Sequence, residues 1–370
     1  QTLNDLSKRF HSDLSTTLRH ASARQRSLLR MVVKSYIESA GPVGSAALKN
    51  RFDLGMSSAT IRNEMSELEK LGLLGHPFTS SGRVPTKLGY QAFVSELMEA
   101  AVLSDQDRMV MERELMSATQ DTQTLIRESS RILSRLARLL GVVLSPKMSE
   151  GVLQRLEIVQ VASDTVMFVI SVRGGFIRTI LMQIDSELRK DQLDALVSLL
   201  NERLAGLTLD EIRRTCLPRF QDLTDEETGL VQLIVDRSTD LFSETPSSGT
   251  IQMDGTTYIL SEPEFSEMAP VKELIDLLDD ESSITQIVEQ SLEQVAGVAG
   301  TGIARIRIGC ESSHPSSGRL SIVSAPYVRS NLRGTIGLIG PTRMNYARAV
   351  ALVEGISTLM SVPGTSEHLA

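Results

Sequence analysis

Three amphipathic helices followed by a hairpin, all within the first hundred residues, constrain the fold of this chain more than any other feature. Apolar residues over Ala23–Ser39 recur at three- and four-residue spacing, which predicts a helix that Gly41-Pro42 ends. A short second helix is expected over Ala46–Arg51, with Ser45 as its N-cap. A third helix is expected from about Ser57 to Leu71, with its own apolar stripe.

A short hairpin follows the third helix. Leu73-Leu74 begins one strand, Thr79–Gly82 is rich in turn-forming residues, and Val84 opens the return strand. Thr86 is expected to cap a further helix that runs to about Ala101. This order of elements predicts a winged helix-turn-helix domain over residues 24–102.

The charge of the chain is divided unevenly. Up to Ser95 there are 13 lysines and arginines against 7 aspartates and glutamates, and the rest of the chain has 25 against 39. The first part therefore carries a net charge of +6 and the second −14, which gives −8 for the whole chain. A basic module on an acidic body indicates that only the first part binds a polyanion such as DNA.

The third helix carries the residues best suited to contact DNA. The second helix of a helix-turn-helix lies in the major groove, with its N-terminal residues facing base edges. In this chain the third helix presents Arg62, whose guanidinium can hydrogen-bond the edge of guanine, and Asn63, whose amide can hydrogen-bond the edge of adenine. The hydroxyls of Ser57, Ser58 and Thr60 suit phosphates, as do the N–H groups of the helix N-terminus. The alternative roles are a solvated helix face and simple helix capping.

The hairpin adds two further cations to the candidate DNA contacts. Arg83 follows the turn residues of the loop tip, from which a long cationic side chain reaches a minor groove or phosphates. Lys87 stands at the next helix start and is a candidate phosphate contact. The alternative for both is an ordinary exposed cation. Lys49 and Arg51 are weaker candidates for contacts to the DNA backbone.

The remaining chain mixes helices and strands. The expected elements are a long helix from residue 105 to Leu140, strands over 156–161, 166–172 and 176–184, a helix over about 193–204, helices headed by Thr208…Glu211 and Thr224…Glu227, a hairpin at Asp254-Gly255, a helix near 270–278, strands over 303–308, 320–324 and 334–339, and a final helix over about 345–360. Strands on both sides of a helical block predict one α+β domain interrupted by an insertion between Asp185 and Glu262.

Several classes of protein are disfavoured by what the sequence lacks. Two cysteines, Cys216 and Cys310, cannot build a disulfide framework or a four-ligand zinc site, so neither a metal nor a cofactor is expected. The sequence has no GxSxG, no P-loop and no HExxH, so an enzyme is not expected. No signal peptide or membrane-spanning run is visible, and reduced cysteines indicate a cytoplasmic protein without a membrane partner.

Selectivity considerations favour a dimer. A single small module buries too little surface for genome-wide selectivity, whereas two modules that read an inverted repeat multiply their discrimination. We therefore expect the acidic body to hold two basic modules together as a homodimer on double-stranded DNA.

Longer motifs carry a resemblance to a known family. The stretches concerned are Gly41-Pro-Val-Gly-Ser45, Leu54-Gly-Met-Ser-Ser-Ala-Thr-Ile-Arg-Asn-Glu-Met65, Pro77-Phe-Thr-Ser-Ser-Gly-Arg-Val-Pro-Thr86, Ser324-Ala-Pro-Tyr327 and Gly334-Thr-Ile-Gly-Leu-Ile-Gly-Pro-Thr-Arg-Met-Asn-Tyr-Ala-Arg348. In these stretches the chain resembles the HrcA family of heat-inducible transcription repressors.

The resemblance implies a homodimeric repressor that binds CIRCE, an inverted-repeat operator upstream of chaperone operons. It also implies that the GroE chaperonin maintains the active repressor, and that unfolded protein draws GroE away on heat shock. The implied division is the winged helix over 24–102, a GAF-like domain over 103–184 and 263–370, and an inserted dimerisation domain over 185–262. Residues 1–23 match no feature of the family, and their polar, Ser/Thr-rich composition predicts a poorly ordered arm.

A regulator gated by a small molecule is the alternative function. GAF-like folds often bind small ligands, and an anion is the ligand that arginines would meet. The arginines in question are Arg305, Arg307, Arg343 and Arg348. The competing interpretation, which we favour, is that they form structural ion pairs or remain solvated. Tyr327 and Tyr346 are expected to be packing residues whose hydroxyls have partners.

Overall fold

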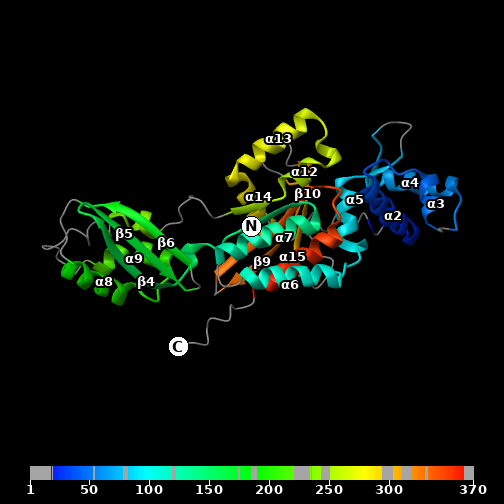
Figure 1. Ribbon diagram of the computed structural model, residues 1–370. Helices are drawn as coiled ribbons and strands as arrows, with labels where there is room; N and C mark the ends of the chain where they lie inside the picture. The colour runs from blue at the N-terminus through cyan, green and yellow to red at the C-terminus, as the bar shows by residue number, and fades with distance from the viewer. Residues whose placement is uncertain are drawn as a thin grey trace.

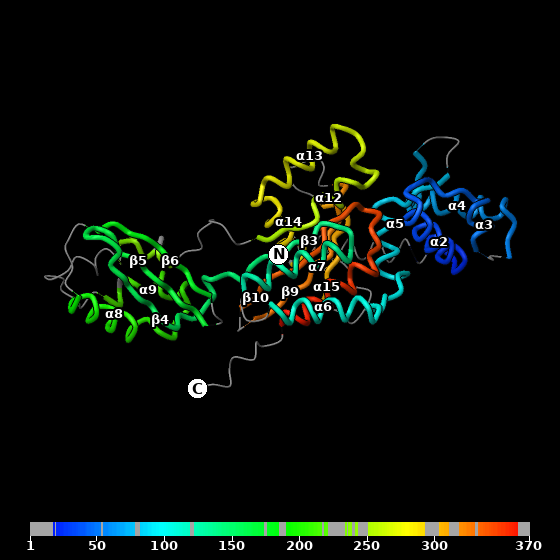
Figure 2. The backbone as a smooth tube through the Cα atoms, in the orientation of Figure 1, coloured from blue at the N-terminus to red at the C-terminus, as the bar shows by residue number. Residues whose placement is uncertain are grey.

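The computed structural model describes residues 18, 20–52, 55–77, 82–118, 122–173, 176–184, 190–220, 234, 236–242, 251–293, 303–310, 318–329 and 332–361. Three parts lie in a row (Figures 1 and 2). We call Ala23–Glu99 at one end the head, and Met148–Phe242 at the other end the insert. The five-stranded sheet between them, with its covering helices, is the body.

The head contains the three predicted helices and the hairpin. Its elements are α2 (Ala23–Ser39), α3 (Ser45–Arg51), α4 (Ser58–Lys70), β1 (Leu74–Gly75), β2 (Val84–Pro85), α5 (Lys87–Ala92) and the π-helical turn η1 (Phe93–Leu97). A capping box between Ser22 and Gln25 begins α2. The prediction of Ser45 as the cap of α3 is wrong, because Gly44 occupies that position without a side-chain bond.

The body is built on a mixed set of antiparallel strands and helices, in keeping with the predicted α+β class. Its elements are α6 (Asp105–Ala118), α7 (Thr122–Ala137), β3 (Leu140–Leu144), β7 (Ile251–Asp254), α12 (Thr256–Leu260), η3 (Pro263–Phe265), α13 (Met268–Asp279), α14 (Glu281–Glu293), β8 (Arg305–Ile308), β9 (Leu320–Arg329), β10 (Leu332–Pro341) and α15 (Tyr346–Met360). The strand order is β7-β3-β10-β9-β8, with every pair antiparallel.

Helices cover both faces of this sheet. Along β3, Val143 belongs to the cluster that includes residues of α7 and α15, whereas Val142 belongs to the cluster under α13 and α14. All five residues of β3 are buried. The sequence predicted a single helix through Leu140 and missed β3, because a strand buried on both faces is apolar at every position and shows no alternation.

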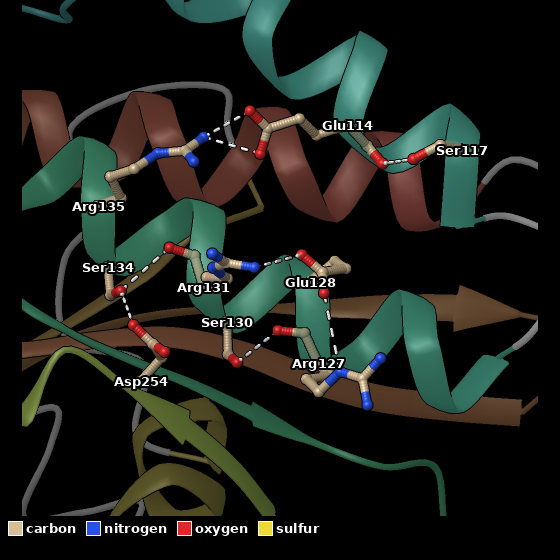
Figure 3. Close-up of polar contacts among 9 residues, drawn as sticks. All are labelled: Glu114, Ser117, Arg127, Glu128, Ser130, Arg131, Ser134, Arg135 and Asp254. Carbon is tan, nitrogen blue, oxygen red and sulfur yellow. Dashed lines mark hydrogen bonds and ion pairs between the residues drawn. The ribbon is translucent and has the colours of Figure 1, made fainter.

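Small residues let α7 pack closely on the sheet. A Cβ at Gly141 in β3 would overlap the carbonyl oxygen of Ser130 in α7. The hydroxyl of Ser134, one turn further along α7, donates to the carboxylate of Asp254 at 2.6 Å (Figure 3). On the outer side of α7, one guanidinium nitrogen of Arg135, Nη2, donates to both carboxylate oxygens of Glu114 in α6. The helix is therefore tied to both the sheet and α6.

The insert is a separate layer of strand and helix with its own core. Its elements are the 3-10 turn η2 (Met148–Glu150), β4 (Leu153–Ala162), β5 (Thr165–Val172), β6 (Phe176–Gln183), α8 (Lys190–Leu204), α9 (Leu209–Phe220) and α11 (Ser238–Phe242). The three strands form an antiparallel sheet in the order β4-β5-β6. One hydrophobic cluster joins its inner face to the helices, including Phe168 and Leu200.

The predicted boundaries of the insertion, 185 and 262, do not match this arrangement. The first boundary would separate β4–β6 from the helices with which they share a core. The second would remove β7 from the body, although Ile251 pairs with Leu144 of β3. The insert therefore leaves the sheet after β3 and returns at β7. The error arose because strand pattern alone does not show which sheet a strand joins.

The hairpin predicted at Asp254-Gly255 is also wrong. β7 pairs with β3, and the chain turns into α12 at Gly255, whose φ of 91° suits glycine. Of the predicted arm over residues 1–23, residues 1–17 and 19 lie outside the described residues. Its last part is not a free arm, because Leu18 and Ala21 are buried and Ser22 caps α2. Thr79–Ser81 of the hairpin tip and the capping box Thr224…Glu227 also lie outside the described residues.

Within the described ranges, no helix combines the length and apolar composition needed to cross a membrane. The same ranges hold no group of three His, Cys, Asp or Glu side chains that could bind a metal ion.

Replacing Gly141 tests the close packing of α7 on β3. Gly141→Ala should lower the free energy of unfolding by about 1–3 kcal/mol, because the added methyl group must displace helix backbone. Gly318→Ala is the control, since its Cβ would meet nothing within 4 Å. Urea unfolding of the two variants measures the difference, and equal midpoints would show that the contact is not tight.

Candidate nucleic-acid interface

The cap of α4 is formed by the residue that the sequence singled out. The hydroxyl oxygen of Ser57 accepts a hydrogen bond from the backbone N–H of Thr60 at 3.1 Å. The two hydroxyl oxygens of these residues lie 2.8 Å apart. Ile61, Met65 and Leu68 form the buried stripe of the helix, as predicted. Capping and burial together fix which side of α4 faces the solvent.

Arg62 and Asn63 lie on that solvent side. Both are exposed, and neither side chain has a hydrogen bond or ion pair to any described residue. The first turns of α4 thus present a guanidinium and a carboxamide with unused bonding capacity, the chemical groups that read guanine and adenine edges.

Ser58 has a structural role within the head. Its hydroxyl lies 3.0 Å from that of Ser45 at the first position of α3. This bond links the starts of the two helices and sets how α3 crosses α4. Ser58 is half-buried, so its hydroxyl faces α3 as well as the solvent.

Most cations of the first three helices have acidic partners inside the head. Arg24 pairs with Glu64, Arg30 and Lys34 pair with Glu99, and Arg51 pairs with Glu38. Among the exposed lysines and arginines from Ala23 to Lys70, only Lys49 and Arg62 have no ion-pair partner in the described part of the chain. Half-buried Arg26 of α2 also has no ion pair there and donates to the carbonyl oxygen of Ala21. The exposed, unpaired positive charge of this range therefore lies on α3 and α4.

Arg83 lies at the base of the hairpin and not at its tip, where the sequence placed it. Its backbone exchanges two hydrogen bonds of 2.9 Å with Val43, in the loop between α2 and α3. Its guanidinium pairs with Glu69 of α4 at 2.8 Å, and the ring of His76 bonds the other oxygen of Glu69. Glu69 thus holds both sides of the hairpin against α4, a role that no sequence motif signalled.

Lys87 faces the body. Its ammonium group donates to the carbonyl oxygen of Gly309, after β8, at 3.4 Å. This contact joins the head to the body, so the structure gives no support to the prediction that Lys87 contacts phosphate.

The arginines considered for an anion have partners within the protein. Arg305 donates to the carbonyls of Ile303 and Ala304, Arg307 to Gln290, Arg343 to Ile37 and Glu262, and Arg348 to Asp107 and Leu136. These bonds favour the structural interpretation of the four side chains.

The buried tyrosines and cysteines of the body and insert also have ordinary structural roles. Tyr327 donates to the carbonyl of Leu144 and Tyr346 to that of Thr342, so both hydroxyls have partners, as expected. Burial raises the pKa of the Cys216 and Cys310 thiols to about 11, which makes both poor nucleophiles.

Comparison with known proteins places the whole chain beside one group of regulators. The family model described as "HrcA protein C terminal domain" matches residues 123–350. A protein of Chlorobium limicola named "Heat-inducible transcription repressor HrcA" is 37% identical over 91% of this chain and 96% of its own length. A protein of Chlorobium chlorochromatii with the same name is 36% identical over 93% and 97%.

One solved structure has the same fold. It is a crystal structure at 2.2 Å of a protein described only as hypothetical, with a TM-score of 0.54 and 22% identity. The match covers 92% of this chain and 97% of that one.

Substitutions at the start of α4 distinguish the residue that caps the helix from the residues that are merely exposed on it. Ser57→Ala should destabilise the helix by about 1 kcal/mol, because the N–H of Thr60 loses its acceptor. Ser57→Asp should restore the cap, whereas Arg62→Ala and Asn63→Ala should change stability by less than about 0.5 kcal/mol. Hydrogen exchange of the α4 amides measures each effect. Unchanged exchange in Ser57→Ala would argue against the cap.

Proposed function

The chain belongs to the HrcA family of heat-inducible transcription repressors, and from that premise we propose that it represses chaperone operons by binding their operator DNA through the head. The observation that carries the proposal is the solvent side of α4, where Arg62 and Asn63 lie unpaired among the described residues beside a capped helix start. Repression is then steric: the bound protein occludes the promoter and no bond is made or broken, so the protein is not an enzyme.

In this proposal the head is a winged helix-turn-helix domain. α3 and α4 form the bihelical unit, α4 enters the major groove, and β1 with β2 form the wing. Arg62 bonds a guanine edge and Asn63 an adenine edge, while Lys49 contacts a phosphate. Ser57 and Thr60 at the N-terminus of α4 add contacts to phosphate oxygens. Arg83 contributes through the position of the wing, which Glu69 holds.

The target is the inverted repeat CIRCE, bound by a homodimer with one head on each half-site. Two identical heads related by a two-fold axis match two half-sites of opposite orientation. The resemblance to the family supports this target. The body is then GAF-like and GroE maintains the active form; both statements rest on the same resemblance. The cytoplasm as the place of action is supported by the two reduced cysteines.

The outer face of the insert sheet is the surface we propose for the dimer. The face turned away from α8 and α9 carries the apolar side chains Val159, Met167, Val169, Ile177 and Leu181, beside the ion pair of Arg155 with Glu157. Register places Val159, Met167 and Leu181 side by side across the three strands. Ile177 and Leu181 are each about two-thirds exposed, at 65% and 64%. An apolar face of this kind favours burial against a second copy.

Loss of base contacts should weaken operator binding selectively. Arg62→Ala and Asn63→Ala should each cost about 1–3 kcal/mol on an inverted-repeat operator and relax preference at one base pair. Lys49→Ala should weaken binding to all DNA sequences. It should also reduce by about 1 the magnitude of the slope of the logarithm of the binding constant against the logarithm of the salt concentration. Footprints and gel shifts on the protein's own chaperone promoters measure these effects.

Arg131→Ala is the matched control for the DNA-binding substitutions, because it removes an exposed arginine from α7 of the body. If Asn63→Ala binds the operator as tightly and as selectively as the wild type, the assignment of α4 as the reading helix is wrong.

A charge on the outer face of the insert should break the dimer. Ile177→Lys and Leu181→Lys place an ammonium group on the surface that we propose to be buried, so they should shift the protein toward monomers. Met268→Lys is the control, because Met268 on α13 is 87% exposed and lies outside this face. Light scattering after gel filtration measures the mass. A stable dimer of the lysine variants would exclude this face.

A further inference from the structure

The head and the body share one continuous hydrophobic core. The same cluster contains Leu29 and Ile61 of the head together with Val323 and Leu352 of the body. The head is therefore packed onto the body and not merely tethered to it. Apolar contact is non-directional, however, so a shared core by itself permits neighbouring orientations of the two parts.

One buried arginine crosses the boundary between the two parts. Arg343, in the turn between β10 and α15, donates to the carbonyl oxygen of Ile37 in α2 at 3.1 Å. Its guanidinium also bonds Glu262, and its Nε lies 2.6 Å from an oxygen of Glu264. The side chain of Arg343 is only 13% exposed. The guanidinium is hydrogen-bonded to Ile37 and Glu262 and ion-paired with Glu264, although its Nε makes no hydrogen bond within the described part of the chain. A planar group with partners on different sides restricts the orientation of the head on the body, which the non-directional apolar core does not.

The two glutamates come from the segment that returns from the insert. Glu262 and Glu264 flank Pro263 at the start of η3, which follows β7 and α12. Arg343 therefore touches the head through α2 and the segment of the body that leads back from the insert. Ile37 lies 306 positions from Arg343 along the chain and Glu262 lies 81 positions from it, yet all three meet at this side chain.

Two tyrosine hydroxyls lie near the ion pair of Arg343 with Glu264, and both charges of the pair affect their pKa values. Burial raises the pKa of the Tyr36 and Tyr90 hydroxyls, and the carboxylate of Glu264 raises both further. The ring of Tyr90 in α5 lies 6.1 Å from that of Tyr346 in α15. The hydroxyl of Tyr90 is buried without a hydrogen-bond partner among the described residues. The boundary is thus a polar cluster set into an apolar core.

Buried ion pairs contribute little net stability, because desolvation offsets the attraction, but they do distinguish one arrangement from its neighbours. We propose that Arg343, held by Glu262 and Glu264, is a clasp that fixes the angle of the head on the body and thereby sets the half-site spacing that the dimer accepts. Arg343 is in this view a positioning residue, and the proposal rests on the proposed function of the chain as a dimeric repressor.

The first test compares full-length wild type with Arg343→Lys on operators of different spacing. The spacer of the inverted repeat is changed in single base-pair steps over one turn of about 10.5 base pairs. The wild type should prefer one spacing. For each protein, the ratio of the affinity for the best spacing to the affinity for the other spacings is measured. Arg343→Lys should reduce this ratio by at least about fivefold, which corresponds to about 1 kcal/mol. Its affinity for an isolated half-site should stay within about twofold of wild type.

Two further variants separate positioning from general damage. Glu264→Gln keeps the size of the side chain but removes the charge that faces Arg343, and should broaden the spacing preference in the same direction. Arg348→Lys is the matched control, because Arg348 bonds Asp107 and Leu136 inside the body and should leave the preference unchanged. A spacing profile of Arg343→Lys identical to wild type, or equal losses on half-site and full operator, overturns the proposal.

A second measurement does not depend on DNA. Hydrogen exchange in the C-terminal turn of α2 and in α5 should be faster in Arg343→Lys than in wild type, and unchanged in Arg348→Lys. If the wild type bound no inverted repeat but exchange still rose, the proposed function would fall while the clasp at the boundary stood. If exchange in both segments matched wild type, the clasp itself would be refuted.

Discussion

Helices on both faces bury the five-stranded sheet, and this burial determines where the other parts of the molecule attach. Because β3 and β7 are neighbours, the chain can leave after one strand and return at the next, which places the whole insert at one end of the body. The cluster on the α7 and α15 face continues into the head at the opposite end.

Electrostatic pairing within the head decides where its positive charge acts. The excess of cations in the first part of the chain is a property of composition, but several of these cations face glutamates on the head itself. Charges paired in this way add little to the field that DNA experiences. Lys49 on α3 and Arg62 on α4 are exposed without such a partner in the described part of the chain, so unpaired positive charge lies beside the solvent side of α4, which we propose to contact DNA.

The fold and the site could be predicted from sequence only where local physics decides the outcome. The bounds of α2 were predicted in full, and the stripe Ile61, Met65 and Leu68 was assigned to the inside of α4, because helical periodicity is written in neighbouring residues. Arg83 was misplaced, because its contacts with Glu69 and Val43 join positions that are far apart in sequence. β3 was missed for a related reason: its partners, β10 and β7, lie more than 100 residues away.

The sequence by itself therefore determined the helices and the hairpin of the head, the exposure of Arg62 and Asn63, and the family to which the chain belongs. Each depends on residue spacing within a few helical turns or on the order of sequence motifs along the chain. The tertiary structure alone decided that β4–β6 form a sheet of their own, that Lys87 faces the body, and that Arg343 lies between Ile37 and two glutamates. These outcomes depend on which surfaces, distant in sequence, become buried against each other. A hydrophobic pattern predicts that a surface is buried, but it does not predict which other surface covers it.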